Sequence, residues 1–174
     1  MESTIIDVDP EGGRVRRLTV PTFEMRPAAE TFGKIAEEEG IEVAYAKCKE
    51  NYKNIGLVLK EVGFNANFAP VADIRHEGAH DIIGDRSFST NPEVVVALCK
   101  AALEGLKEAG VLGVIKHIPG HGGSKQDSHD VLPTIETSLE ELEATDFYVF
   151  KQLASECKVA MTAHINYIKI CEIN

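Results

Sequence analysis

VLGVIKHIPGHGGSKQDSH (residues 111–129) joins an apolar run to a loop crowded with titratable side chains. The first five residues are typical of a buried strand, and a helical pattern that begins at Asn91 and Pro92 precedes them. A strand that follows a helix and ends in charged residues, here Lys116 and His117, is typical of parallel sheets built from β-α-β units. The stretch therefore predicts an α/β fold with polar chemistry just beyond a strand end.

The rest of the chain repeats this alternation. Apolar residues recur at helical spacing over residues 45–62, and Gly63 is placed to close that helix. Gly110 is placed to close the helix that begins at Asn91, and Ser138 with Glu141 forms a capping-box pattern ahead of a third helix. Strands are expected at residues 4–9, 64–74, 111–117 and 158–164. The order β-α-β-α-β-α-β requires parallel strands joined by helical crossovers.

Polar residues gather where these expected strands end. They are Asp9 and Glu11, Asp73, Lys116 and His117, and His164. In a parallel sheet or barrel the carboxyl ends of the strands share one edge, and ligands bind there. We expect one continuous site.

Composition narrows the class of protein. The 174 residues carry a net charge of −10, which repels phosphate backbones and anionic membrane surfaces. The four cysteines (Cys48, Cys99, Cys157 and Cys171) are scattered without a C-x-x-C pair, which favours free thiols in a reducing compartment. No leader follows Met1, and no apolar run approaches the ~18 residues of a membrane span. We expect a cytoplasmic protein that binds neither nucleic acid nor membrane.

Six motifs identify a family resemblance. DVDPEGGRVRRL, NFAPVADI, IGDRSFS, KHIPGHG, DSH and MTAHI occur in the order seen in family 3 glycoside hydrolases. The chain most resembles the bacterial β-N-acetylglucosaminidases of peptidoglycan recycling, over about residues 5–167. The resemblance implies a partial TIM (β/α)8 barrel, roughly strands two to six, with residues 1–174 as one incomplete domain. The implied activity is removal of terminal non-reducing N-acetyl-β-D-glucosamine from muropeptide fragments by a retaining mechanism, without metal or organic cofactor.

Two departures from the family pattern bear on activity. Pro10 replaces the glutamine of the usual DQEGGRV, a mild change. The family's nucleophile is an aspartate in an SDD-type motif after the seventh strand, and the 174 residues stop before it. We therefore expect no turnover of an aryl N-acetyl-β-glucosaminide by these residues alone. We also expect the open barrel edges to promote self-association.

Asp127 and His129 are the candidate catalytic pair. The resemblance implies that His129 is the acid/base and that Asp127 fixes its tautomer and stabilises the imidazolium. An imidazole titrates near neutral pH, so it can give a proton and later take it back. The spacing alone favours an Asx-turn aspartate beside a solvated histidine, and it is the flanking motifs that reverse this preference.

The candidate sugar-binding residues follow from the same resemblance. They are Asp9, Arg17, Arg86, Lys116 and His117, and Asp73 and His164 are candidates for supporting roles on the same rim. Each has a structural alternative. Lys116 would pair with Asp73 or Asp9, and Arg86 with Asp85 or Asp81. Arg17 would be a solvated charge or a partner for Glu11, while Asp9 would be a turn carboxylate. Pro119, Gly120, Gly122 and Gly123 are expected to shape a tight reversal near the ligand, with His121 in a structural role.

Three other functions are alternatives to the β-N-acetylglucosaminidase. His117, His121, Asp127 and His129 are residue types that bind zinc, but their spacing fits no zinc motif. A catalytically inactive sugar-binding remnant is consistent with the missing nucleophile segment. A family 3 β-glucosidase is the third alternative, although its members generally lack the D-x-H loop at this position.

Overall fold

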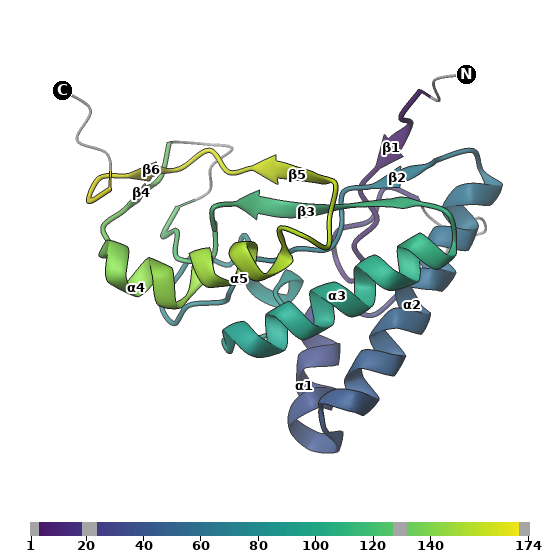
Figure 1. Cartoon of the computed structure of the whole chain (residues 1–174), viewed down its shortest axis with the longest axis horizontal. Coiled ribbons are helices and arrows are strands. Elements are labelled where there is room, and N and C mark those ends of the chain that lie inside the picture. The colour runs from purple at the N-terminus through teal and green to yellow at the C-terminus, as the bar shows by residue number, and fades with distance from the viewer. Residues whose placement is uncertain (1–3, 19–23, 127–131, 171–174) are drawn as a thin grey trace.

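A parallel β-sheet runs through the computed structural model, which describes residues 4–18, 24–126 and 132–170 (Figure 1). Its strand order is β1-β2-β3-β5, with β1 at Asp7–Val8, β2 at Ala66–Asn67, β3 at Leu112–Ile118 and β5 at Val159–Thr162. Every neighbouring pair in this sheet is parallel. A small second sheet pairs β4 (Thr134–Ile135) with β6 (Asn166–Tyr167). The predicted α/β fold with parallel strands and helical crossovers is confirmed, and the described residues do not close into a barrel.

Helices connect the strands and lie together on one side of the sheet (Figure 1). They are α1 (Ala29–Glu39), α2 (Ile41–Glu61), α3 (Pro92–Glu108), α4 (Leu139–Ala144) and α5 (Asp146–Leu153), with a 3₁₀ turn η1 at Gly84–Arg86. The crossover helices α2 and α3 pack against each other, α3 also packs against β3, and α5 packs on α3. This arrangement leaves the strand ends free to carry polar side chains.

The predicted helix ends are confirmed by their hydrogen bonds. The Asn91 side chain accepts from the backbone N–H of Glu93, and Ser138 accepts from that of Glu141. Gly63 and Gly110 each donate to a carbonyl in the last helical turn, and the residue after each glycine donates one step further back. These are Schellman endings, which satisfy carbonyls that a helix end otherwise leaves unpaired.

The sequence pattern missed one helix and one helix break. α1 precedes the helix expected over residues 45–62, and Gly40 (φ 96°) turns the chain between α1 and α2. The region before β5 is two helices, because Thr145 leaves the helical conformation between α4 and α5. A pattern of apolar spacing marks the buried face but does not detect a change of helix axis.

The strand predicted over residues 64–74 is regular only at β2. Pro70 has no N–H to donate, so the ladder cannot continue through it. The segment still follows β3 in an extended path: Lys116 N–H donates to the Pro70 carbonyl, and Ala72 N–H donates to the Lys116 carbonyl. The prediction was therefore correct that residues 64–74 run alongside β3, and wrong that they form one regular strand.

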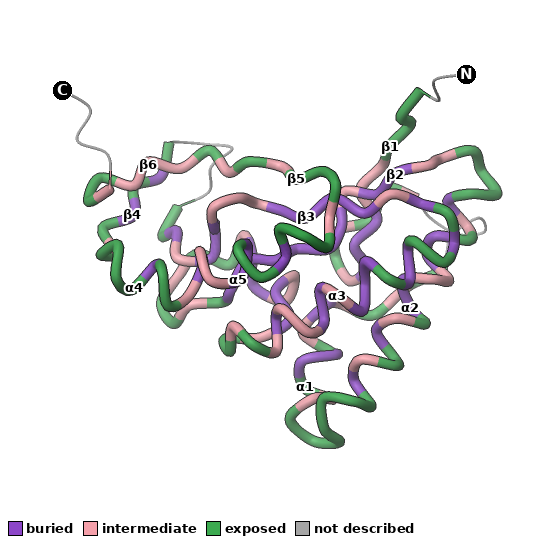
Figure 2. Tube along the Cα trace, in the orientation of Figure 1, coloured by how far each residue is buried: buried purple, intermediate pink, exposed green. Residues whose placement is uncertain are grey.

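The apolar core lies between the helices and the sheet. Figure 2 shows the buried positions concentrated along α2, α3 and the adjoining strands. Tyr52, Ile55 and Leu59 of α2 meet Leu98 and Leu106 of α3 in one cluster of buried residues. This core is the rigid base from which the strand ends project.

The two outer strands keep exposed edges within the described residues. β1 pairs only with β2 and β5 only with β3, and Val159 of β5 is 38% exposed. Unpaired backbone groups on an edge strand are a template for pairing with another chain.

Expressed as these 174 residues, the protein is expected to self-associate through such an edge. Light scattering coupled to size-exclusion chromatography should show a mass that rises with protein concentration. Val159→Lys should lower that mass, because a lysine on an edge strand opposes pairing. Val43→Lys, on an equally exposed position of α2, should leave it unchanged. A monomer at every concentration would contradict the expectation.

Among the described residues, none of the helices has the length and apolar content needed to span a membrane.

Candidate active site

A pocket of about 610 Å³ lies at the carboxyl ends of β1, β3 and β5. Its lining includes Asp9, Arg17, Arg86, Lys116, His117 and His164, all of them predicted from the sequence. Asp73 lies behind this lining, where it contacts His117. The expected convergence of the described residues at one edge of the sheet is therefore observed.

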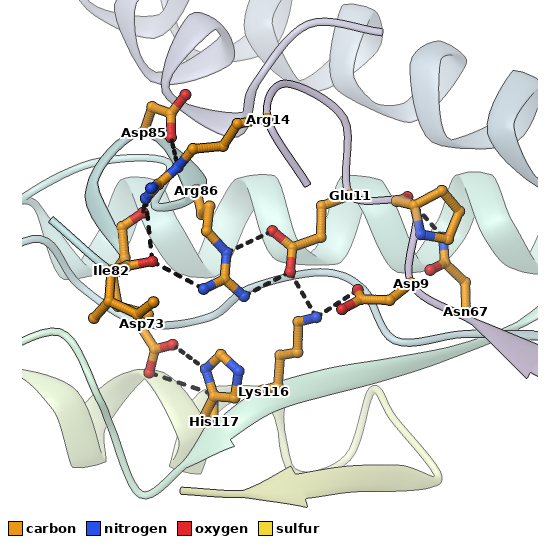
Figure 3. A network of polar contacts seen from close by, with 12 residues as sticks. Asp9, Glu11, Arg14, Asn67, Asp73, Ile82, Asp85, Arg86, Lys116 and His117 are labelled. Carbon is orange, nitrogen blue, oxygen red and sulfur yellow. Dashed lines mark hydrogen bonds and ion pairs between the residues drawn. The ribbon is translucent and has the colours of Figure 1, made fainter. Parts of the chain in front are cut away.

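Lys116 is the central cation of the pocket. Its side chain is 1% exposed, and its Nζ lies 2.6 Å from Asp9 Oδ1 and 2.6 Å from Glu11 Oε1 (Figure 3). A buried ammonium is costly unless carboxylates compensate it, and two do so here. The proposed ion pair with Asp9 is thus present, whereas the one with Asp73 is not.

Lys116 and His117 are adjacent in sequence, yet both line the pocket. Successive side chains of a regular strand point to opposite faces. The pairing of β3 with β5 shifts register between Lys116 and Ile118, so the strand is irregular at this point. The irregularity brings two neighbouring polar side chains to one site.

Glu11 connects the two cations of the pocket, although the sequence analysis did not select it as a site residue. Arg86 donates to it through both Nε and Nη2, at 2.8 and 2.7 Å, and Lys116 donates to the same carboxylate. Burial raises the pKa of Glu11, but the hydrogen bonds and charges of Arg86 and Lys116 outweigh burial and hold the pKa below its ordinary value. Figure 3 shows Glu11 between the two side chains.

A signal for Glu11 did exist in the sequence. Glu11 lies two positions after Asp9, and in an extended segment side chains at that spacing point to the same side. The sequence analysis named both residues at the end of one expected strand, but it offered Glu11 only as an alternative partner for Arg17.

The alternative partners considered for Arg86 are wrong. Its guanidinium binds Glu11 and donates to the Ile82 carbonyl at 2.9 Å, rather than to Asp85 or Asp81. Arg14 takes the Asp85 carboxylate instead, at 2.8 Å. Arg14 therefore binds η1 and the loop before it, while Arg86 lines the pocket.

Asp73 anchors His117 from beneath the pocket. The carboxylate is fully buried and lies 2.6 Å from His117 Nδ1, while the backbone N–H groups of His117 and His121 donate to its other oxygen at 3.3 and 2.7 Å. Burial raises the pKa of Asp73, but the His117 charge and these hydrogen bonds hold it below its ordinary value. Since a carboxylate only accepts, His117 donates through Nδ1 and presents Nε2 to the pocket.

His121 is buried, and its ring lies edge-on to that of His117 with 5.7 Å between the centroids. Burial lowers the pKa of His121, only partly opposed by the charge of Asp73. His121 also lines the pocket. It is thus closer to the site than the structural role predicted for it implied.

Two of the glycines after β3 lie where the backbone approaches other parts of the protein closely. A methyl group at Gly122 would overlap the carbonyl of Ile74, and one at Gly120 would overlap Asp146. Close backbone approach of this kind requires glycine. The turn is therefore pressed against the segment that carries Asp73.

Asp127 and His129 lie outside the described residues, so their catalytic roles stay predictions. The zinc alternative depends on the same two residues and is equally untested. The described part of the loop is ordered by local bonds: Ser124 Oγ donates to the Gln126 carbonyl at 2.6 Å, and the His80 N–H donates to the Ser124 carbonyl at 2.8 Å.

The arrangement can bind a neutral, polyhydroxylated ligand. Asp9 and Glu11 balance Lys116 and Arg86, so the pocket combines strong donors and acceptors with no net charge from these four side chains. The Asp9 side chain keeps 23% exposure at the pocket while one oxygen holds Lys116. Charged groups that are fixed by each other are suited to hydrogen bonding with hydroxyls.

A parallel α/β sheet with a charged pocket at the carboxyl ends of its strands defines a ligand-binding domain of the barrel-forming type. The chain belongs to glycosyl hydrolase family 3: the model of the family's N-terminal domain matches residues 3–172.

Comparison with individual proteins supports this assignment. A Beta-hexosaminidase of Neisseria gonorrhoeae (strain NCCP11945) is 40% identical, with 95% of this chain and 46% of that protein covered. A Beta-hexosaminidase of Methylococcus capsulatus is also 40% identical, with coverage of 95% and 48%. The crystal structure of NagZ from Neisseria gonorrhoeae in complex with N-trifluoroacetyl-D-glucosamine superimposes with a TM-score of 0.91 at 38% identity, again over 95% of this chain and 48% of the other. The chain thus spans about half the length of the relatives it matches.

Proposed function

We propose that this chain supplies the sugar-binding half of a β-hexosaminidase site, which removes terminal non-reducing N-acetyl-β-D-glucosamine from muropeptide fragments by a retaining mechanism. The observation that carries the proposal is the buried network Asp9–Lys116–Glu11–Arg86 at the pocket. Membership of glycosyl hydrolase family 3 supports it, as does the relative crystallised with N-trifluoroacetyl-D-glucosamine.

Each pocket residue has a role in this proposal. Asp9 accepts hydrogen bonds from ring hydroxyls, and Lys116 orients Asp9 while donating to the sugar. Arg86 and Arg17 donate to hydroxyls on the other side of the pocket. His117 donates or accepts through Nε2, since Nδ1 is held by Asp73. Fixed donors and acceptors position the anomeric carbon without reorganisation during reaction.

The reacting groups complete the proposal. His129 would protonate the leaving oxygen and later deprotonate water, with Asp127 stabilising the imidazolium. A retaining mechanism also needs a nucleophilic carboxylate on the opposite face of the sugar. We propose that this aspartate comes from outside the 174 residues. No residue of the described pocket is assigned to that step.

We further propose that residues 1–174 fold as one incomplete barrel domain of a cytoplasmic protein. The single buried cluster that joins α2, α3, α5 and the sheet supports one domain. The free thiols of Cys48, Cys99 and Cys157 support a reducing compartment.

Fluorine NMR of N-trifluoroacetyl-D-glucosamine tests the binding role without depending on turnover. The protein is expected to bind this sugar, and Asp9→Asn to weaken binding by about 10- to 100-fold, because a charged hydrogen-bond acceptor is lost. Asp85→Asn makes the same chemical change at the surface pair with Arg14 and should leave the affinity unchanged.

Displacement of the fluorinated probe by unlabelled sugars then distinguishes a β-hexosaminidase from a β-glucosidase. N-acetylglucosamine should displace the probe at lower concentration than glucose does. Equal or stronger displacement by glucose would favour a β-glucosidase, and absence of binding by the folded protein would reject the proposed role.

A further inference from the structure

A second carboxylate–imidazole pair lies outside the sugar pocket. Asp146, the first residue of α5, is 4% exposed, and its Oδ2 lies 2.9 Å from His76 Nε2. The hydroxyl of Thr145 donates to the same oxygen at 3.2 Å. Neither Asp146 nor His76 lines the pocket that holds Asp9 and Lys116. Their partnership is therefore not explained by direct contact with a ligand in that pocket.

Asp146 packs directly against the turn that follows β3. A methyl group at Gly120 would overlap the Asp146 carboxylate, so the turn and α5 are in close contact. The Gly120 N–H donates to the His117 carbonyl at 2.8 Å, and the Tyr167 hydroxyl donates to the Gly120 carbonyl. Gly120 is thus in contact with α5 and forms hydrogen bonds with β6 and with His117.

His76 belongs to the segment that carries Asp73. That segment meets the same turn, because Gly122 lies against the carbonyl of Ile74. Asp73 binds the turn on the side of the pocket, through His117 and His121. His76, three residues further on, binds Asp146 and so ties the segment to α5.

We propose that Asp146 and His76 are positioning residues, which hold residues 73–76 against the turn at 117–122 and thereby set the orientation of the His117 imidazole in the pocket. The inference rests on the proposed function, since His117 is proposed to contact the sugar. Neither residue is catalytic: both act through the backbone that carries His117 and its partner Asp73.

The electrostatics of His76 agree with this geometry. The hydrogen bond from His76 to Asp146 raises the pKa of His76, and burial only partly opposes it. Because the pKa of His76 is higher in the folded protein than in the unfolded chain, the pair contributes its full stabilisation at pH values below the unfolded pKa of about 6.5. That stabilisation is lost as the pH rises through the raised value. Within the part of the chain that the structure describes, the charged and titratable groups around His76 are Asp146 on α5, Glu141 on α4, Asp73 after β2, and Arg75, Glu77, His80 and Asp81 in its own loop.

Three variants test the proposal with N-trifluoroacetyl-D-glucosamine as the probe. His76→Gln and Asp146→Asn are each expected to weaken binding of the probe about fivefold or more. The double variant should bind the probe as tightly as the single variants do, because the pair acts as a unit. Ile55→Val, a destabilising change in the buried face of α2, controls for stability and should bind as the unchanged protein does.

The pH dependence gives a readout that a general loss of stability would not produce. The ratio of the dissociation constant of His76→Gln to that of the unchanged protein should be largest near about pH 5.5 and should approach one as His76 loses its proton. A ratio that is independent of pH, or affinities within about twofold for every variant, would overturn the proposal.

A second measurement separates this inference from the proposed function. If the unchanged protein does not bind the sugar, the proposed function fails. The positioning role can still be tested, because the proton–nitrogen NMR correlations of the His117 ring report the orientation of that ring without any ligand. These signals should move in His76→Gln and in Asp146→Asn but not in Ile55→Val. Unchanged His117 signals in both variants would refute the positioning role.

Discussion

Replacing Glu11 with alanine is expected to lower the free energy of unfolding by about 3–5 kcal/mol, because it leaves two buried cations without their shared carboxylate. Arg86 and Lys116 have side-chain exposures of 11% and 1%, so water cannot take the place of Glu11. Urea denaturation followed by circular dichroism, at one protein concentration, measures the loss. Sugar binding should fall as well, since both cations line the pocket.

The matched control for Glu11 is Glu108 on α3. Glu108 also binds two cations, Lys49 and Lys53, but its side chain is 42% exposed. Glu108→Ala should leave the free energy of unfolding nearly unchanged, because solvent screens surface pairs. Equal losses for the two variants would show that burial does not strengthen the Glu11 network, contrary to our interpretation.

Acid denaturation supplies an independent test of the Glu11 contacts. The pKa of Glu11 is lower in the folded protein than in the unfolded chain, so its contribution is complete above the unfolded value of about 4.3. The contribution is lost as the pH falls through the folded value. Glu11→Gln cannot titrate and should therefore flatten the decline of stability in that acid range.

Replacing Asp73 with alanine is expected to be comparably severe, with a loss of about 3–5 kcal/mol and no detectable sugar binding. The change removes the acceptor of the His117 imidazole and of the His117 and His121 N–H groups from a fully buried position. Unpaired buried donors lose their water without compensation. Denaturation and fluorine NMR measure the two effects on the same samples.

Asp73→Asn and Asp85→Ala separate the causes of that loss. Asparagine keeps one acceptor oxygen in nearly the same shape, so Asp73→Asn should fold better than Asp73→Ala while still releasing His117 from its charged partner. Asp85→Ala removes an exposed carboxylate and should change stability by less than about 1 kcal/mol. A fully stable Asp73→Ala protein would show that the three contacts contribute little.

Much of the fold was predictable because its signals are local. Asn91, Ser138, Gly63 and Gly110 mark helix ends through hydrogen bonds that span only a few residues. The helix α1 was not predicted, and the break at Thr145 was missed because a pattern of buried positions does not record a change of helix direction. The irregular path after β2 was also missed, although Pro70 indicated it.

The candidate site was predictable to the level of the sheet edge. Parallel strands place their carboxyl ends together, so polar residues at those ends had to converge, and Asp9, Lys116, His117 and His164 do. Arg17 and Arg86, assigned by resemblance, line the same pocket. Asp127 and His129 fall outside the described residues, and their roles stay predictions.

The sequence by itself determined the alternation of strands and helices, the helix ends and the polar residues at the strand ends, because neighbouring residues decide each of these. Only the tertiary structure decided which charge meets which. Glu11 binds Arg86 across 75 residues, and Lys116 binds Asp9 across 107. The choice of Arg86 over Arg17, or of Glu11 over Asp85, depends on a few ångströms between segments that meet only in the folded chain, and ion pairing is decided at that scale.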